Sequence, residues 1–175
     1  MSRKTPSFFP DSHSGFTMIE LMVVVAIGAI VAAIAIGGLS HLIPRSQVKS
    51  ATQKLQADLQ KAKLEAVKSN EDALVTFTAA SGGSQGSYQA CFDNDSDGSC
   101  DAAAGDTMIA ENSFTDNNYK HALLSNVAFS LGGTSVQFDS RGMPNGNGTI
   151  DITCSSDASY SLSIVISRTG RIRIN

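Results

Sequence analysis

The sequence predicts an α+β protein in which a long N-terminal helix, membrane-spanning in its first half, packs on an antiparallel β-sheet domain. Three observations carry this prediction: an uncharged apolar run near the N-terminus, a helical apolar stripe after it, and a remainder rich in strand and turn signals. The chain has 175 residues, enough for one globular domain plus such a helix. Its net charge of −3 argues against an extended basic surface that binds nucleic acid. A local basic patch is compatible with this charge.

The apolar run covers residues 21–39, which contain no charged side chain. At about 1.5 Å per residue a helix of that length nearly spans a hydrocarbon core about 30 Å thick. Arg3 and Lys4 precede the run, which predicts a cytoplasmic N-terminus. We therefore expect residues 16–44 to form a single membrane-spanning helix.

The second half of the expected helix covers residues 45–70 and is amphipathic. Gly37, Gly38 and Pro44 predict a kink or a local melting between the halves. Leu64 lies off the apolar stripe, where it either faces a neighbouring subunit or is a tolerated exposed leucine. The pattern ends at residues 69–70, and the stripe consists of Val48, Ala51, Leu55, Leu59, Ala62 and Ala66.

Residues 71–175 predict a β-rich globular domain. Its strands are expected at residues 73–78, 88–92, 107–110, 127–131, 135–139, 149–154, 160–167 and 171–174. The glycine-rich residues 142–148 predict a turn.

The residues just before the apolar run have an unusual composition. Gly15 is followed by Phe16, and Glu20 stands at the edge of the membrane segment, where a carboxylate usually has a partner. Cleavage after Gly15 would create an amine on Phe16 that could neutralise Glu20 of its own or a neighbouring chain. The alternative is a plain signal anchor with an incidental glutamate.

Residues 15–21 (Gly-Phe-Thr-Met-Ile-Glu-Leu) resemble the class III signal of type IV pilins and type II secretion pseudopilins. The resemblance implies that residues 1–15 are a leader, longer than many, which a prepilin peptidase removes between Gly15 and Phe16. It also implies N-methylation of Phe16 and a role for Glu20 in guiding assembly against the N-terminus of a neighbour.

Two C-terminal segments resemble the GspH/FimT branch of these proteins. Residues 136–144 carry its F-x-x-x-G-x-P pattern, and residues 161–174 carry its terminal strand pair with the G-R-x-R ending. The resemblance implies a minor pilin or pseudopilin that is anchored in the bacterial inner membrane by a single span. Its domain would be periplasmic, and its partners would be other major and minor pilins or pseudopilins within a fibre.

The terminal strip of Arg168, Arg171 and Arg173 is the sharpest candidate binding site. Arg171 and Arg173 are two residues apart, so on a strand they project from one face and could contact successive phosphates. The FimT-like branch resembles DNA-binding minor pilins of natural transformation, which implies double-stranded DNA as a partner and these arginines as its contacts. Lys120 and Arg141 are weaker candidates. The plainer interpretation is that these are ordinary surface arginines at a solvated strand end. The protein would then be a structural tip pseudopilin of a type II secretion system.

The three cysteines lack a C-x-x-C pair and a histidine cluster, which argues against a zinc site. In an exported domain the simplest arrangement is one disulfide and one spare thiol. Cys91 and Cys100 would close a short loop, but either could instead pair with Cys154, and the sequence leaves all three pairings open.

An acidic stretch matches the first half of a calcium loop through Asp93, Asp95, Asp97 and Gly98, with Asp101 at the ninth position. The twelfth position is alanine rather than glutamate, so we favour an Asx-rich turn over a metal site. No motif for a catalytic nucleophile, a metalloprotease or a phosphate loop is present in the sequence. We therefore expect no enzyme, no cofactor and no small-molecule substrate.

Overall fold

The computed structural model describes residues 15–115 and 117–175, and of these it gives residues 35–41 and 117 without their side chains. The chain divides into two compact units, the second of which comprises His41–Asn175. Of the predicted leader, residues 1–15, all but Gly15 lie outside the described residues.

Helix α1 runs from Met18 to Ser69, and local hydrogen bonds mark both of its ends. Thr17 precedes the helix, and its Oγ1 accepts a bond of 3.3 Å from the Glu20 N–H, which is the geometry of an N-cap. Asn70 has a φ of 58°, and the Glu71 N–H donates to the Ala66 carbonyl at 3.3 Å. This is a Schellman cap, so the helix ends where the sequence predicts.

Helix α1 is continuous through Gly37, Gly38 and Pro44, so the predicted melting between its halves is wrong. A proline removes only one bond from the i→i−4 ladder, and the bonds on either side of it can persist. The Pro44 side chain is buried, so its packing within the second unit offsets part of that cost.

All described side chains from Gly15 to Ile34 are exposed, including the apolar ones that follow Phe16. The apolar run of residues 21–39 extends into the segment whose side chains are not described. Among the described residues, no helix is long and apolar enough to cross a membrane. Membrane insertion of residues 16–44 therefore stays a prediction.

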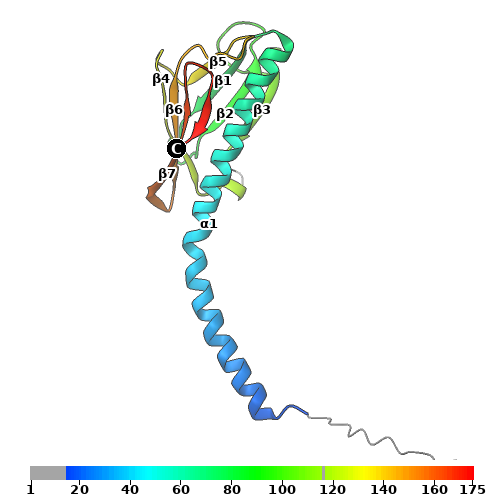
Figure 1. The fold of residues 1–175 in the computed structure, drawn as a ribbon, viewed down its shortest axis with the longest axis vertical. Coiled ribbons are helices and arrows are strands. Elements are labelled where there is room, and N and C mark those ends of the chain that lie inside the picture. Colours follow the sequence, from blue (N-terminus) through cyan, green and yellow to red (C-terminus); the bar gives the residue numbers. More distant parts are fainter. Residues whose placement is uncertain (1–14, 116) are drawn as a thin grey trace, which may run out of the picture. The chain divides into compact units, whose positions relative to one another are not determined.

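The second unit contains two four-stranded antiparallel sheets beside the outer part of α1 (Figure 1). The strand order is β3-β2-β1-β5 in one sheet and β4-β6-β7-β8 in the other. The strands are β1 (Ala73–Thr78), β2 (Ser87–Phe92), β3 (Thr107–Ser113), β4 (Ala122–Phe129), β5 (Ser135–Phe138), β6 (Gly148–Cys154), β7 (Asp157–Ile166) and β8 (Ile172–Ile174). A short 3-10 helix, η1, covers Asn117–Tyr119.

The core forms where the apolar stripe of α1 meets both sheets. The six predicted stripe residues are at most 1% exposed, so the predicted buried face is confirmed. They share one cluster with Val75 and Phe138 of the first sheet and with Ile150 and Ile164 of the second. Burial of this apolar surface is the main stabilising contribution to the unit. Leu64, off the stripe, is 64% exposed.

One polar group of α1 lies under the first sheet. Asp58 is 7% exposed, and its carboxylate accepts a bond of 2.6 Å from the Tyr88 hydroxyl and one of 2.7 Å from Lys54. Burial, followed by the bond to Asp58, raises the pKa of Tyr88 above its ordinary value, so the hydroxyl stays protonated and donates. The paired groups satisfy a charge that would otherwise be costly to bury.

The predicted strand at residues 127–131 is wrong at both ends. Strand β4 begins at Ala122, and Leu131 lies beyond it in a turn with 69% exposure. A register shift between Leu124 and Asn126 interrupts the pairing of β4 with β6. Such a bulge breaks the two-residue alternation by which a strand is recognised in sequence.

Cys91 and Cys100 form a disulfide, which resolves the pairing that the sequence left open. Cys154 is a free thiol that is 2% exposed, with its Sγ 3.2 Å from the Ser156 hydroxyl oxygen. The bridge closes the acidic stretch into a loop between β2 and β3.

We predict that reduction of the Cys91–Cys100 bridge lowers the free energy of unfolding by about 2–3 kcal/mol, because the unfolded chain regains the entropy of a short closed loop. Urea denaturation of the oxidised chain, beside the Cys91→Ser/Cys100→Ser variant, measures this difference. Thiol titration of the oxidised native chain should find no reactive thiol, and one after unfolding. Equal unfolding midpoints, or three thiols after unfolding, would contradict the assignment.

Candidate functional site

The three C-terminal arginines lie on and beside the β7–β8 hairpin. In this hairpin Val165 pairs with Arg173 and Ile166 pairs with Ile172. Ile172 and Ile174 pack against the core, so the alternating side chains of Arg171 and Arg173 point outward and are exposed. Two exposed guanidinium groups therefore lie at the start of the edge strand β8 and on it, and the isoleucines of the strand's other face anchor it to the core.

Within the part of the chain that the structure describes, Arg171 and Arg173 make no ion pair. The ion pairs found there join Arg45 to Asp157, Lys54 to Asp58, Lys68 to Glu65, and Arg141 to Asp139. The two strand arginines thus keep their full hydrogen-bonding capacity for an anion.

Arg168 lies in the turn of residues 167–171, which we call the arginine turn. The Gly170 N–H donates to the Ser167 carbonyl at 2.9 Å, and the Ser167 N–H donates to the Arg171 carbonyl at 3.0 Å. The Ser167 hydroxyl oxygen accepts a further bond from the Arg171 N–H at 3.1 Å. Arg168 is exposed, and its Nε donates to Asn147 Oδ1 at 3.2 Å.

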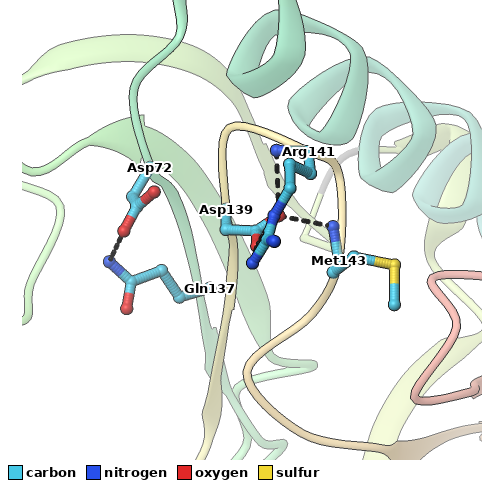
Figure 2. Close-up of polar contacts among 5 residues, drawn as sticks. All are labelled: Asp72, Gln137, Asp139, Arg141 and Met143. Carbon is cyan, nitrogen blue, oxygen red and sulfur yellow. Dashed lines mark hydrogen bonds and ion pairs between the residues drawn. The ribbon is translucent and has the colours of Figure 1, made fainter.

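The loop of residues 139–143, which we call the aspartate loop, is organised by one carboxylate (Figure 2). Asp139 accepts bonds from the Met143 N–H at 2.8 Å and the Arg141 N–H at 3.0 Å, and its other oxygen pairs with the Arg141 guanidinium at 3.2 Å. The Met143 N–H, then the amide and guanidinium of Arg141, lower the pKa of Asp139 below its ordinary value. The carboxylate therefore stays ionised and holds the loop.

The arginine turn and the aspartate loop meet at two glycines. Gly170 has a φ of 73°, and a Cβ at this position would lie 2.6 Å from the Gly142 carbonyl oxygen. Gly142 has a φ of 74°, and a Cβ there would lie 3.1 Å from Val67 Cγ2 on α1. Both glycines are required by conformation and by space, which explains why the F-x-x-x-G-x-P and G-R-x-R segments contain them.

Of the weaker candidates, the structure brings only Arg141 near the arginine turn. Arg141 belongs to the aspartate loop, and its side chain is 84% exposed. Lys120 lies two residues before Ala122, the first residue of β4, which pairs with Cys154. Gly148 and Ile166 pair at the opposite end of the sheet, beside the arginine turn. Lys120 is therefore not part of the same surface.

The acidic stretch forms a loop, closed by the disulfide, in which carboxylates accept bonds from backbone N–H groups. Asp93 accepts bonds from the Asp97 and Gly98 N–H groups, and Asp106 accepts bonds from the Asn94 and Asp101 N–H groups. The carboxylates of Asp93, Asp95 and Asp106 lie within 4.8 Å of one another. Asp106 has no place in the calcium-loop spacing. Asx turns, in which a carboxylate accepts from the N–H two residues further on, are made by Asp95, Asp97 and Asp101. The carboxylates of the acidic stretch thus bind backbone groups.

At the N-terminal motif, Phe16 and Glu20 are exposed, and Phe16 directly precedes the capping residue Thr17. Glu20 occupies the first turn of α1, where a carboxylate interacts favourably with the helix dipole. The motif therefore presents an apolar ring and a carboxylate at the start of the helix, without a partner for Glu20 among the side chains that the structure describes.

We predict that Gly170→Ala lowers the free energy of unfolding by about 1–3 kcal/mol, because alanine is strained at positive φ and its Cβ would clash with the Gly142 carbonyl. Gly132→Ala is the matched control, since Gly132 has a φ of 75° and open space around its Cβ position. The excess loss at Gly170, measured by urea denaturation, isolates the close approach. Equal losses in the two variants would show that the contact between the turns contributes nothing.

Comparisons with known proteins agree with this architecture. Residues 11–36 match the model of the prokaryotic N-terminal methylation motif, and residues 51–170 match the family model described as type II transport protein GspH. A search of curated proteins finds no match to this chain.

Among solved structures, the chain is similar to the type IV minor pilin FimU of Pseudomonas aeruginosa strain PAO1, in two crystal forms. One has a TM-score of 0.52 at 18% identity, covering 75% of this chain and 90% of that chain. The other has a TM-score of 0.50 at 17% identity, covering 73% and 91%. At this identity the likeness shows the pilin fold alone. The family match spans most of the described sheets and the outer part of α1, and the chain therefore belongs to the GspH family.

Proposed function

We propose that this chain, a minor pilin or pseudopilin by family, binds double-stranded DNA through Arg168, Arg171 and Arg173 while it is part of a type IV pilus-like fibre. The observation that carries the proposal is the pair of exposed guanidinium groups of Arg171, which directly precedes β8, and Arg173, which lies on it; neither has an ion pair in the described part of the chain. Such groups can replace counterions on successive phosphates without first breaking an internal salt bridge.

The geometry supports contact with the phosphate backbone rather than with base edges. Arg171 and Arg173 flank a single residue on an edge strand, so their Cα atoms are about 7 Å apart, close to the spacing of neighbouring phosphates. Binding of this kind is independent of sequence and falls steeply with salt.

The proposal includes the maturation of the N-terminus. A prepilin peptidase would cut between Gly15 and Phe16, Phe16 would be N-methylated, and residues 16–44 would anchor the chain in the inner membrane before assembly. The match of residues 11–36 to the methylation motif and the exposed apolar side chains that follow Phe16 support this sequence of events. Glu20 would then pair with the N-terminal amine of a neighbouring subunit, because a carboxylate among apolar helices needs a partner.

A structural tip pseudopilin of a type II secretion system is the second candidate. The description of the matching family as a type II transport protein favours it. In that role the domain would contact neighbouring subunits, and the C-terminal arginines would be ordinary surface residues.

We predict that Glu20→Ala is inserted and cleaved normally but is missing from fibres, because the helix loses the charge that pairs with its neighbour. Immunoblots of the membrane fraction and of sheared fibres from the host measure both steps. Glu65→Ala is the matched control, since it removes a carboxylate from the outer part of the same helix, where Glu65 is half-buried and pairs with Lys68. Normal incorporation of Glu20→Ala would remove this role.

We predict that the full chain in detergent binds a DNA duplex in a salt-dependent manner and that Arg171→Gln/Arg173→Gln loses most of this affinity. Each lost phosphate contact should flatten the plot of log affinity against log salt by about 0.9. Fluorescence anisotropy of a labelled duplex across a salt series gives both quantities.

The control variant is Lys49→Gln/Lys68→Gln, which removes the same charge from α1 and should keep the wild-type slope. Absence of binding at low salt, or equal losses in the two double variants, would favour the structural pseudopilin.

A further inference from the structure

One lysine of α1 touches both the arginine turn and the aspartate loop. Lys63 Nζ donates a hydrogen bond of 2.9 Å to the carbonyl oxygen of Gly170. Its Cε and Cγ lie 2.8 Å and 3.2 Å from the position that a Cβ on Gly142 would occupy. The aliphatic stem of Lys63 therefore packs on one glycine, and its ammonium group binds the other.

The space between these groups is filled completely. A Cβ on Gly170 would lie 3.0 Å from Lys63 Nζ as well as 2.6 Å from the Gly142 oxygen. Three segments that are far apart in sequence thus meet at one point. The buried stripe fixes α1 and therefore the backbone of Lys63. The arginine turn packs against the side chain that this fixed backbone carries.

The bonds within the arginine turn do not fix its position relative to the rest of the domain. The Gly170 and Ser167 amides bond only inside the turn, and Arg168 reaches Asn147 by one bond of 3.2 Å from an exposed side chain. The Lys63 bond to Gly170 is half-buried and joins the turn to the helix. Together with the pairing of Ile166 with Ile172 and the Gln56 bond to the Ile172 carbonyl, it holds the turn in place beside α1.

We propose that Lys63 is a positioning residue for DNA binding: it holds the arginine turn against α1 so that Arg168 and Arg171 are ordered before phosphate arrives. This inference rests on the proposed function. A turn that is ordered in advance loses less conformational entropy on binding, which favours affinity without adding a contact. The ammonium group of Lys63 donates to a backbone carbonyl and not to a phosphate. Lys63 therefore releases no counterion from the DNA.

The test compares Lys63→Met with Lys61→Met in the full chain in detergent. Methionine keeps the aliphatic stem and removes the charge and the donor. Lys61 is the matched control because its Nζ also donates to a sheet carbonyl, that of Ile109 on β3, at 2.6 Å. Both variants change net charge equally, but only Lys63 touches the arginine turn.

We expect Lys63→Met to weaken DNA binding about three- to tenfold, the effect of one hydrogen bond, with an unchanged salt slope. In the free protein, hydrogen exchange of residues 167–171 should accelerate in Lys63→Met and stay at the wild-type rate in Lys61→Met. In an Arg168→Gln/Arg171→Gln background, Lys63→Met should cause no further loss of affinity, because it acts through these arginines.

Three outcomes would overturn the inference. A flatter salt slope in Lys63→Met would make Lys63 a direct phosphate contact. Unchanged exchange in the arginine turn, or an equal loss of affinity in the Arg168→Gln/Arg171→Gln background, would show that Lys63 does not act through the turn. If the wild-type chain binds no DNA, the proposed function itself is wrong, and the inference falls with it. Binding by the wild type with an unaltered turn in Lys63→Met overturns the inference alone.

Discussion

Burial of one narrow face of α1 beneath two sheets is the constraint on which the rest of the second unit depends. The six stripe residues are small or medium-sized, which allows both sheets to approach the helix closely. Side chains that flank the stripe then reach the backbone of the strands. Lys61 bonds Ile109 on β3, Lys63 bonds Gly170, and Gln56 bonds Ile172 on β8. The helix thus fixes one edge of each sheet as well as forming the core.

This arrangement brings the two segments that resemble the family, residues 136–144 and 161–174, into contact. The F-x-x-x-G-x-P and G-R-x-R segments look independent in sequence, but Gly142 and Gly170 lie against each other and against the same lysine. Asp139 shapes the first segment, and the Ser167 backbone and hydroxyl groups shape the second. Arg171 and Arg173 are exposed because their neighbours face the interior: Ile172 and Ile174 pack against the core, and Gly170 binds Lys63.

The sequence predicted the features that depend on local pattern. The stripe from Val48 to Ala66 and the end of α1 at Ser69 follow from helical periodicity, and the structure has them. The sequence left open a kink or a melting at Pro44, where α1 is continuous, and it missed the start of β4 at Ala122, because tertiary packing and a bulge override local signals there.

The candidate site was predictable only in part. Arg168, Arg171 and Arg173 are recognisable as a cationic strip, but the role of Lys63 depends on a contact 107 residues away in sequence. The same holds for Asp106, which joins the acidic loop from beyond the disulfide. The cysteine pairing could not be derived because three sulfurs allow three pairings and spacing alone does not decide among them.

Arginine-specific chemical modification, mapped by mass spectrometry with and without a DNA duplex, tests the central claim most directly. Phenylglyoxal should label Arg168, Arg171 and Arg173 in the free chain, and DNA at low salt should protect all three. Arg45, which pairs with Asp157 at 2.9 Å and lies over the Tyr160 ring, is the internal reference and should react equally in both samples. Protection limited to the three C-terminal arginines would support this surface as the DNA interface. Equal reactivity with and without DNA, or uniform protection that includes Arg45, would contradict it.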